Sequence, residues 1–220
     1  RPAEPGAAGD LYIVVNAGCK HQDWALIEEA TKGEANLVRA DDRCLLALQG
    51  PNAHVAAAAV IDPALAEMNF MTVKRYDAFG RITVTRSGYT GEDGYEILVR
   101  AENATNLANA LLAHAEVKPI GLGARDSLRL EAGLCLYGHD LDPKTSPIEA
   151  DLAWTIQKRR REAKDFPGAK RILREYELGA AKKRVGVRPN DRAPAREGVE
   201  IMKDGKTIGV VTSGGFSPVL

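Results

Sequence analysis

The stretch Ser87-Gly88-Tyr89-Thr90-Gly91-Glu92-Asp93-Gly94-Tyr95-Glu96 places three glycines within seven residues. Glycine enters turn conformations that other residues avoid, so this stretch predicts a wide, permissive turn. Residues 81–86 before it alternate polar and apolar side chains, and residues 95–99 after it form a mostly apolar run. Together they predict an antiparallel hairpin at the centre of an all-β segment over residues 70–99.

The segments on either side of this hairpin mix helices with strands. Alternating or β-branched runs predict strands, whereas apolar residues three and four apart predict helices. These patterns give strands over residues 11–16 and 45–48, and helices over residues 22–31, 51–60, 102–115 and 124–131. Because the two kinds of element are mixed but segregated, the sequence predicts an α+β fold with an antiparallel sheet.

The character of the chain changes near residue 168. Residues 183–213 read as short strands separated by turns, starting with residues 184–187, and Lys203-Asp204-Gly205-Lys206 is a strong hairpin signal. We therefore predict a first domain over residues 1–169 and the start of an incomplete C-terminal β-barrel over residues 170–220.

Composition argues against several classes of protein. Lys plus Arg equals Asp plus Glu, so a formal net charge of zero disfavours a chain-wide nucleic-acid footprint. Cys19, Cys44 and Cys135 lack metal-ligand spacing, so we expect no metal, and a sparse odd set suits the reduced thiols of a cytosol or organellar matrix. No apolar run approaches the ~20 residues of a membrane span. Residues 1–9 lack the apolar core of a secretion signal.

Five segments together resemble the glycine cleavage T-protein family, through their order and spacing rather than through any one of them. They are residues 14–19, 88–96, 123–133, 154–170 and 211–215. The resemblance extends over nearly all of residues 10–220. It implies a folate-binding aminomethyltransferase core with antiparallel sheets, followed by a C-terminal β-barrel.

The resemblance also implies an activity. Family members move a one-carbon unit from an aminomethyl group on a lipoylated carrier protein, the H-protein, to tetrahydrofolate. Ammonia leaves, and 5,10-methylenetetrahydrofolate forms. Tetrahydrofolate is thus expected as a substrate, with no metal, no nucleic acid and no membrane partner. The implied compartment is the cytoplasm of a bacterium or the mitochondrial matrix of a eukaryote.

Two charged residues are the first candidates for a folate site. A carboxylate that accepts two N–H donors suits the edge of a pterin, and the family places a glutamate at the position of Glu96. Period two also allows an ordinary outward-facing strand carboxylate there. The family uses an arginine at the position of Arg125 to contact the folate. An ordinary arginine near a helix start, paired with Asp126 or Glu131, is the alternative.

The resemblance adds six further candidates, each with a simpler structural alternative. Tyr12, Val14 and Asn16 share one face of the strand expected over residues 11–16, and Asn16 also suits a turn cap. The other three are Trp154, Tyr89 and Arg184, for which the alternatives are a core anchor, turn packing and a solvated charge.

Lys158, Arg159, Arg160 and Arg161 form the densest run of charge. Such a run is usually a solvated helix face. The functional interpretation is docking of an acidic carrier protein, since complementary charge raises encounter rates.

Parts of the family pattern fall outside this sequence. The family's key aspartate precedes the segment that matches residues 11–16, where this chain has the loop-like residues 1–9, so no catalytic residue is assigned. Truncation at both ends is the expectation. The competing hypotheses are a folate-binding module without transfer activity, a relative of the folate domain of dimethylglycine- or sarcosine-oxidising enzymes or of iron–sulfur assembly proteins, and an inactive fragment.

Overall fold

The computed structural model describes residues 11–190 and 193–218. The chain forms two compact units, Arg1–Gly121 and Leu122–Leu220. The domain boundary expected near residue 170 is a different division and stays a prediction.

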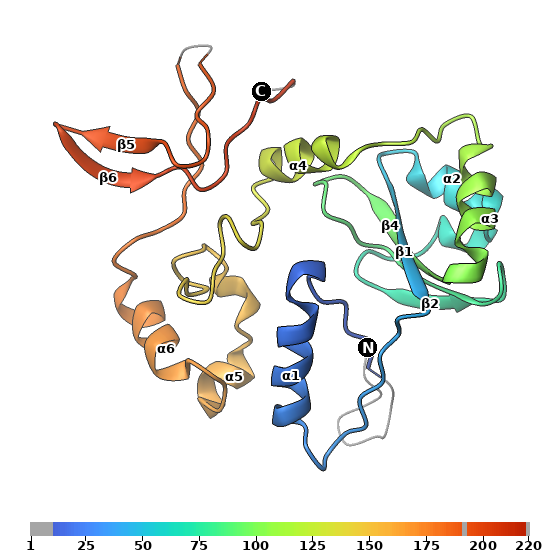
Figure 1. Cartoon of the computed structure of the whole chain (residues 1–220), viewed down its shortest axis with the longest axis horizontal. Helices are drawn as coiled ribbons and strands as arrows, with labels where there is room; N and C mark the ends of the chain where they lie inside the picture. Colours follow the sequence, from blue (N-terminus) through green and yellow to red (C-terminus); the bar gives the residue numbers. More distant parts are fainter. Residues whose placement is uncertain (1–10, 191–192, 219–220) are drawn as a thin grey trace. The chain divides into compact units, whose positions relative to one another are not determined.

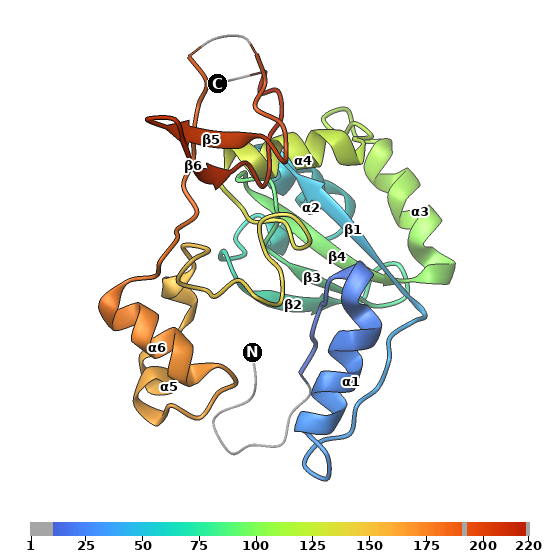
Figure 2. The same cartoon turned by 60° about the vertical axis from the view of Figure 1, so that its left-hand side comes forward.

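The first unit contains a four-stranded antiparallel sheet. Its strands are β1 (Arg43–Gln49), β2 (Val73–Tyr76), β3 (Ile82–Thr85) and β4 (Gly94–Arg100), in the order β1-β4-β3-β2 (Figures 1 and 2). The hairpin expected around the glycine-rich stretch is confirmed, because β3 and β4 pair on either side of it. β4 pairs with β1 on one edge and with β3 on the other, so it is an interior strand of the sheet.

Helices α2 (Ala53–Val60) and α3 (Ala101–Leu112) cover one face of this sheet (Figure 1). Both confirm predicted helices, as does α1 (Lys20–Ala30), which has no buried residue. Short 3-10 turns occur at Ala17–Cys19 and Pro63–Leu65. The core is the set of buried side chains between the sheet and the two helices: Leu48, Ala53, Ala56, Ala57, Leu65, Met68, Ile82, Val84, Tyr95, Ile97, Val99, Leu107 and Leu111.

The strand pleat divides β4 between two environments. Tyr95, Ile97 and Val99 are 0% exposed on the helix-covered face, whereas Glu96 and Leu98 are only half-buried on the opposite face. β1 alternates in the same way, and Leu45 is 45% exposed, so the strand predicted over residues 45–48 is a half-buried edge strand. A carboxylate at position 96 therefore needs no burial in the apolar core.

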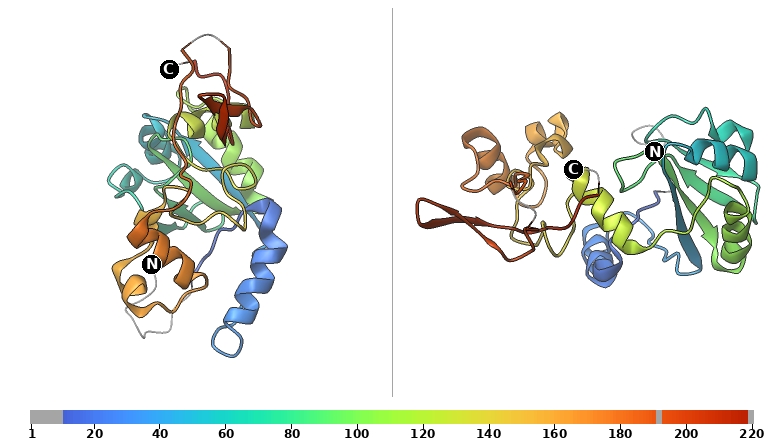
Figure 3. Two further views of the ribbon diagram at one scale, coloured as in Figure 1. Left: turned by 90° about the vertical axis from the view of Figure 1, so that its left-hand side faces the viewer. Right: turned by 90° about the horizontal axis from the view of Figure 1, so that it is seen from above.

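The second unit is built from short helices and one hairpin. The helices are α4 (Leu122–Glu131), α5 (Lys158–Ala163) and α6 (Ala169–Leu178), with a 3-10 turn at Ala153–Thr155. β5 (Glu200–Lys203) and β6 (Lys206–Val210) form a twisted antiparallel ribbon (Figure 3). Asp204 and Gly205 both have positive φ, as a two-residue hairpin turn requires, which confirms that prediction.

Two expected strands are wrong. Residues 11–16 and 184–187 form no strand, and no ladder joins either segment to another described residue. β-branched composition gives a segment the capacity for a strand, but the strand exists only when a partner supplies its hydrogen bonds.

None of the helices in the described ranges has the length and apolar character needed to cross a lipid bilayer.

The side chain of Gln49 forms hydrogen bonds with three residues in and beside the glycine-rich turn. Its Nε2 donates to the carbonyl oxygens of Ser87 and Tyr95, each at 3.1 Å, and its Oε1 accepts a hydrogen bond from Thr90 at 3.2 Å. A Cβ at Gly88 would overlap this amide. A Cβ at Gly94 would lie 2.6 Å from Gln49 Cδ and 2.7 Å from the Leu48 carbonyl oxygen. The space beside Gln49 therefore requires glycine at positions 88 and 94, whereas Gly91 is the glycine of this stretch that has a positive φ.

We predict that Gly94→Ala lowers the free energy of unfolding by about 1–3 kcal/mol, since the added methyl meets a strand carbonyl that cannot move aside. Gly121→Ala is the matched control, because nothing lies within 4 Å of a Cβ there. Urea denaturation of the two variants measures the difference. Equal stability of Gly94→Ala and the parent chain would contradict this packing.

Candidate functional site

Glu96 lies on β4 opposite Ala47 and Thr85 and belongs to the sheet face that α2 and α3 leave uncovered. Ser87 Oγ donates to Glu96 Oε2 at 2.8 Å. Among the described residues, no arginine or lysine pairs with this carboxylate. The Ser87 hydroxyl is therefore the hydrogen-bond donor to the Glu96 carboxylate among the described side chains. The remaining acceptor positions of this carboxylate are not occupied by a cationic side chain from the described residues.

The turn that precedes Glu96 is closed by an ion pair. Arg86 donates through Nε and Nη2 to the two carboxylate oxygens of Asp93, at 2.9 and 2.7 Å. Its Nη1 also donates to the carbonyl oxygen of Met68 at 2.5 Å. The hydrogen bond from Arg86 lowers the pKa of Asp93. Tyr89 is half-buried within this closed turn.

Residues 11–16 place their candidates differently from the prediction. Tyr12 and Val14 are exposed, and Asn16 Oδ1 accepts a hydrogen bond from the Gly18 N–H at 3.0 Å. The capping role proposed for Asn16 is confirmed. Because residues 11–16 are not a strand, the shared strand face expected for Tyr12, Val14 and Asn16 is wrong.

Three candidates lie in the second unit. Arg125 is an exposed residue of α4. Trp154 is 81% exposed, which rules out the core-anchor alternative for its side chain. Arg184 donates through Nε to the Ala150 carbonyl oxygen and through Nη1 to that of Gly133, both at 2.9 Å, so it is not a merely solvated charge.

The eight folate-site candidates are thus divided between the units. Tyr12, Val14, Asn16, Tyr89 and Glu96 belong to the first, and Arg125, Trp154 and Arg184 to the second. Within the first unit, Tyr89 and Glu96 share one hairpin, whereas residues 11–16 are not paired with its strands. In the described ranges, no group of three or more His, Cys, Asp or Glu side chains has metal-binding geometry.

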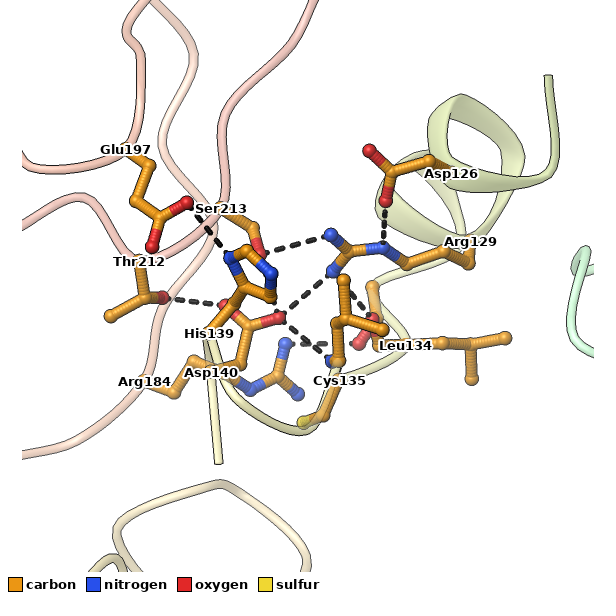
Figure 4. A network of polar contacts seen from close by, with 12 residues as sticks. Asp126, Arg129, Leu134, Cys135, His139, Asp140, Arg184, Glu197, Thr212 and Ser213 are labelled. Carbon is orange, nitrogen blue, oxygen red and sulfur yellow. Dashed lines mark hydrogen bonds and ion pairs between the residues drawn. The ribbon is translucent and has the colours of Figure 1, made fainter. Parts of the chain in front are cut away.

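Sequence reasoning missed a buried arginine, Arg129, whose guanidinium is the centre of a polar network (Figure 4). Nε donates to Asp126 and Nη1 to Asp140, each at 2.8 Å. Nη1 also reaches the Leu134 carbonyl oxygen at 3.2 Å, and Nη2 reaches Ser213 Oγ at 3.0 Å. Arg129 is one helical turn after Arg125 on α4, so the network fixes the helix that carries a folate-site candidate.

Asp140 accepts the remaining hydrogen bonds of this network. Oδ1 accepts from Thr212 at 2.5 Å, while Oδ2 accepts from Ser213 at 2.8 Å and from the Leu136 N–H at 2.9 Å. Burial raises the pKa of Asp140, but these hydrogen bonds and the Arg129 charge outweigh it and lower the pKa overall. Arg129, Thr212 and Ser213 lie inside segments of the resemblance, which was the one signal available. Nothing in the sequence pairs them with Asp140.

The basic run from Lys158 to Arg161 forms the first turn of α5. Three of its four side chains contact an acidic residue or a tyrosine. Lys158 lies 3.7 Å from Glu162, and Arg160 lies 3.0 Å from Asp165. Arg161 donates to the hydroxyl of Tyr176 and lies over its ring, 4.7 Å from the centroid. Arg159 instead donates to the neutral amide of Gln157 at 3.0 Å.

Comparisons with known proteins identify the family. A family model described as "GCVT N-terminal domain" matches residues 7–160, and one described as "Glycine cleavage T-protein C-terminal barrel domain" matches residues 182–220. This chain belongs to the glycine cleavage T-protein family. These matches confirm the predicted fold class, including the partial C-terminal barrel domain.

The chain is similar to proteins named "Aminomethyltransferase, mitochondrial". It is 47% identical to those of Mus musculus and Homo sapiens and 48% identical to that of Flaveria trinervia, over 96% of this chain and 54% of each relative. A solved structure of aminomethyltransferase T from Bartonella henselae matches with a TM-score of 0.85 and 45% identity, over 93% of this chain and 56% of that one. The chain therefore spans about half the length of these relatives.

We predict that Asp140→Asn lowers the free energy of unfolding by about 3 kcal/mol at pH 7, because it removes the buried anion of Arg129 and leaves only the exposed Asp126. A carboxylate with a lowered folded-state pKa stabilises above its unfolded pKa, about 3.9. That stability is lost as the pH falls through the folded-state pKa. The difference between parent and variant should therefore shrink below about pH 4, as measured by urea denaturation across pH.

Asp126→Asn is the matched control for this prediction. Asp126 also contacts Arg129, but its side chain is 60% exposed, so its removal should cost less than about 1 kcal/mol. Similar losses for the two variants would contradict the primary role given to Asp140.

Proposed function

We propose that this chain carries the folate-binding part of an aminomethyltransferase. The reaction moves the one-carbon unit from an aminomethyl-dihydrolipoyl carrier protein, the H-protein, to tetrahydrofolate, with release of ammonia and formation of 5,10-methylenetetrahydrofolate. The observation that carries this proposal is Glu96, a carboxylate without a cationic partner among the described residues, on the sheet face that α2 and α3 leave uncovered.

Glu96 is proposed to bind the pterin. The pterin edge presents neighbouring N–H donors, and a carboxylate accepts two of them in parallel. Because β4 is hydrogen-bonded on both sides, the backbone at position 96 is fixed, and its carboxylate needs little reorganisation when the ligand binds.

The other candidates are proposed to surround the rest of the folate. Tyr12, Val14, Tyr89 and Trp154 offer apolar or aromatic surface, and Asn16 an amide. Arg125 and Arg184 would contact the folate through their guanidinium groups, which match carboxylate and carbonyl oxygens. In Arg184 such contacts would add to the two carbonyl bonds that already orient it.

The reaction depends mainly on how the protein places tetrahydrofolate and the aminomethyl group relative to each other. N5 of tetrahydrofolate bonds to the methylene carbon of the aminomethyl group, either directly or after loss of ammonia, and the C–N bond to the departing ammonia breaks. N10 then closes the ring with release of the dihydrolipoyl thiol. Holding the partners at reacting distance lowers the barrier by several kcal/mol. We assign no catalytic acid or base to this chain.

The remaining features of the proposal follow the family. The first domain is proposed to cover residues 1–169 and the barrel to start at residue 170. The proposed compartment is the mitochondrial matrix of a eukaryote or the cytoplasm of a bacterium. Because the chain spans about half of its relatives, a folate-binding piece without transfer activity is the second candidate. Transfer from an aminomethylated carrier separates the two.

We predict that Glu96→Gln weakens tetrahydrofolate binding by about 1–3 kcal/mol, since a charged hydrogen-bond acceptor is replaced by a neutral one. Titration calorimetry under anaerobic conditions measures the effect. Glu92→Gln, on the exposed part of the same turn, should leave the affinity unchanged. Unchanged binding by Glu96→Gln would remove Glu96 from the site.

We also predict that Arg159→Glu slows turnover with the H-protein while tetrahydrofolate affinity stays constant. Lys158, Arg159, Arg160 and Arg161 are the proposed docking run, and Arg159 has no acidic partner among the described residues. The defect should diminish as salt screens the encounter. Lys118→Glu in the first unit is the control. A salt-independent loss, or equal loss of folate binding, would argue for misfolding instead.

A further inference from the structure

A directed chain of hydroxyl groups ends on Glu96. Thr85 Oγ1 and Ser87 Oγ lie 2.8 Å apart, and Ser87 Oγ lies 2.8 Å from Glu96 Oε2. An ionised carboxylate only accepts hydrogen bonds, so the single Ser87 hydrogen points to Glu96. Thr85 then donates to Ser87 at 2.8 Å, and its contact with the Glu96 carbonyl oxygen at 3.4 Å is the longer and weaker of its two contacts. The direction of both bonds follows, and such a chain polarises each bond toward the carboxylate.

This arrangement distinguishes the two oxygens of Glu96. Oε2 accepts the Ser87 hydroxyl, whereas Oε1 accepts no hydrogen bond from the described residues. A glutamate side chain has three rotatable bonds before its carboxylate, and ordering it on binding costs free energy. A hydroxyl that holds one oxygen in the free protein removes part of that cost and sets the plane in which the other oxygen is presented.

Ser87 is itself held by the side chain of Gln49. The Gln49 amide donates to the carbonyl oxygens of Ser87 and Tyr95, the residue before Glu96. It therefore bridges the two backbone segments that carry the hydroxyl and the carboxylate. Gly88 and Gly94 provide the space for this amide, as described above.

We propose that Ser87 is a positioning residue that orients the Glu96 carboxylate for the pterin, and that Gln49 fixes the backbone from which Ser87 acts. The inference rests on the proposed function, because it takes Glu96 as the pterin ligand. Ser87 has no ligand contact of its own in this proposal and controls the affinity for folate through the Glu96 carboxylate.

The first experiment compares Ser87→Ala with Ser87→Thr in the full chain. The probe is 5-formyltetrahydrofolate, a reduced folate that resists oxidation and has the same pterin edge. Ser87→Ala should raise the Kd about tenfold. Ser87→Thr keeps the hydroxyl and should stay within about threefold of the parent. Thr83→Ala is the control and should bind like the parent, because it removes a β3 hydroxyl that takes no part in the hydrogen bonds joining Thr85, Ser87 and Glu96.

The second experiment separates positioning from a general loss of structure. Ser87→Ala is repeated in a Glu96→Gln background, where the amide oxygen accepts only a weaker, neutral hydrogen bond. If Ser87 acts through the charge, its effect on Kd falls to about threefold or less. A full tenfold loss in both backgrounds, or a Ser87→Thr variant as weak as Ser87→Ala, overturns the proposal. So does a Kd for Ser87→Ala within twofold of the parent.

Binding of the probe by the parent chain tests the proposed function, and the effect of Ser87→Ala tests the positioning role. A folded parent chain that does not bind the probe contradicts the proposed function, and the inference falls with it. A parent chain that binds, with Ser87→Ala unaffected, contradicts only the positioning role. Gln49→Glu, which sets a carboxylate against two carbonyl oxygens, should weaken binding as Ser87→Ala does; parent-like affinity there removes Gln49 from the proposal.

Discussion

The pairing of β1 with β4 is the interaction on which the first unit depends. Seven consecutive residue pairs, from Arg43 with Arg100 to Gln49 with Gly94, join segments that are about fifty positions apart in the chain. The ladder turns one side of β4 toward α2 and α3, and these helices leave the other side uncovered. The strand therefore contributes to the apolar core and to the proposed ligand site through alternate residues. Stability and binding are supplied by one backbone.

The second unit depends on charge rather than on a large apolar core. Arg129 and Asp140 are both buried, and each is satisfied by several partners from α4, the following loop and residues 212–213 (Figure 4). A buried pair of this kind is costly to form and more costly to break. The pair and its hydrogen bonds join three segments of the second unit: α4, the following loop and residues 212–213.

Local patterns in the sequence predicted most of the fold. The glycine-rich hairpin, α1 to α4 and the Asp204-Gly205 turn follow from residues close together in the chain, and the structure confirms them. The strand expected over residues 11–16 was wrong, since strand formation depends on a partner that composition does not reveal. For the site, family resemblance selected Glu96. It gave no means to see Ser87 or Gln49, whose roles arise from contacts across the turn and between strands.

The Gln49 amide also bears on how the sheet reaches its correct alignment. β1 and β4 are both rich in apolar residues, and a slip of one position would exchange the faces of β4, sending Glu96 toward the helices and Tyr95 outward. Gln49 lies opposite Gly94, where there is room for its side chain. One position away it would face Asp93 or Tyr95, and its amide would lose both carbonyl partners. The pairing of a long amide with a glycine thus favours this strand register over the two registers one position away.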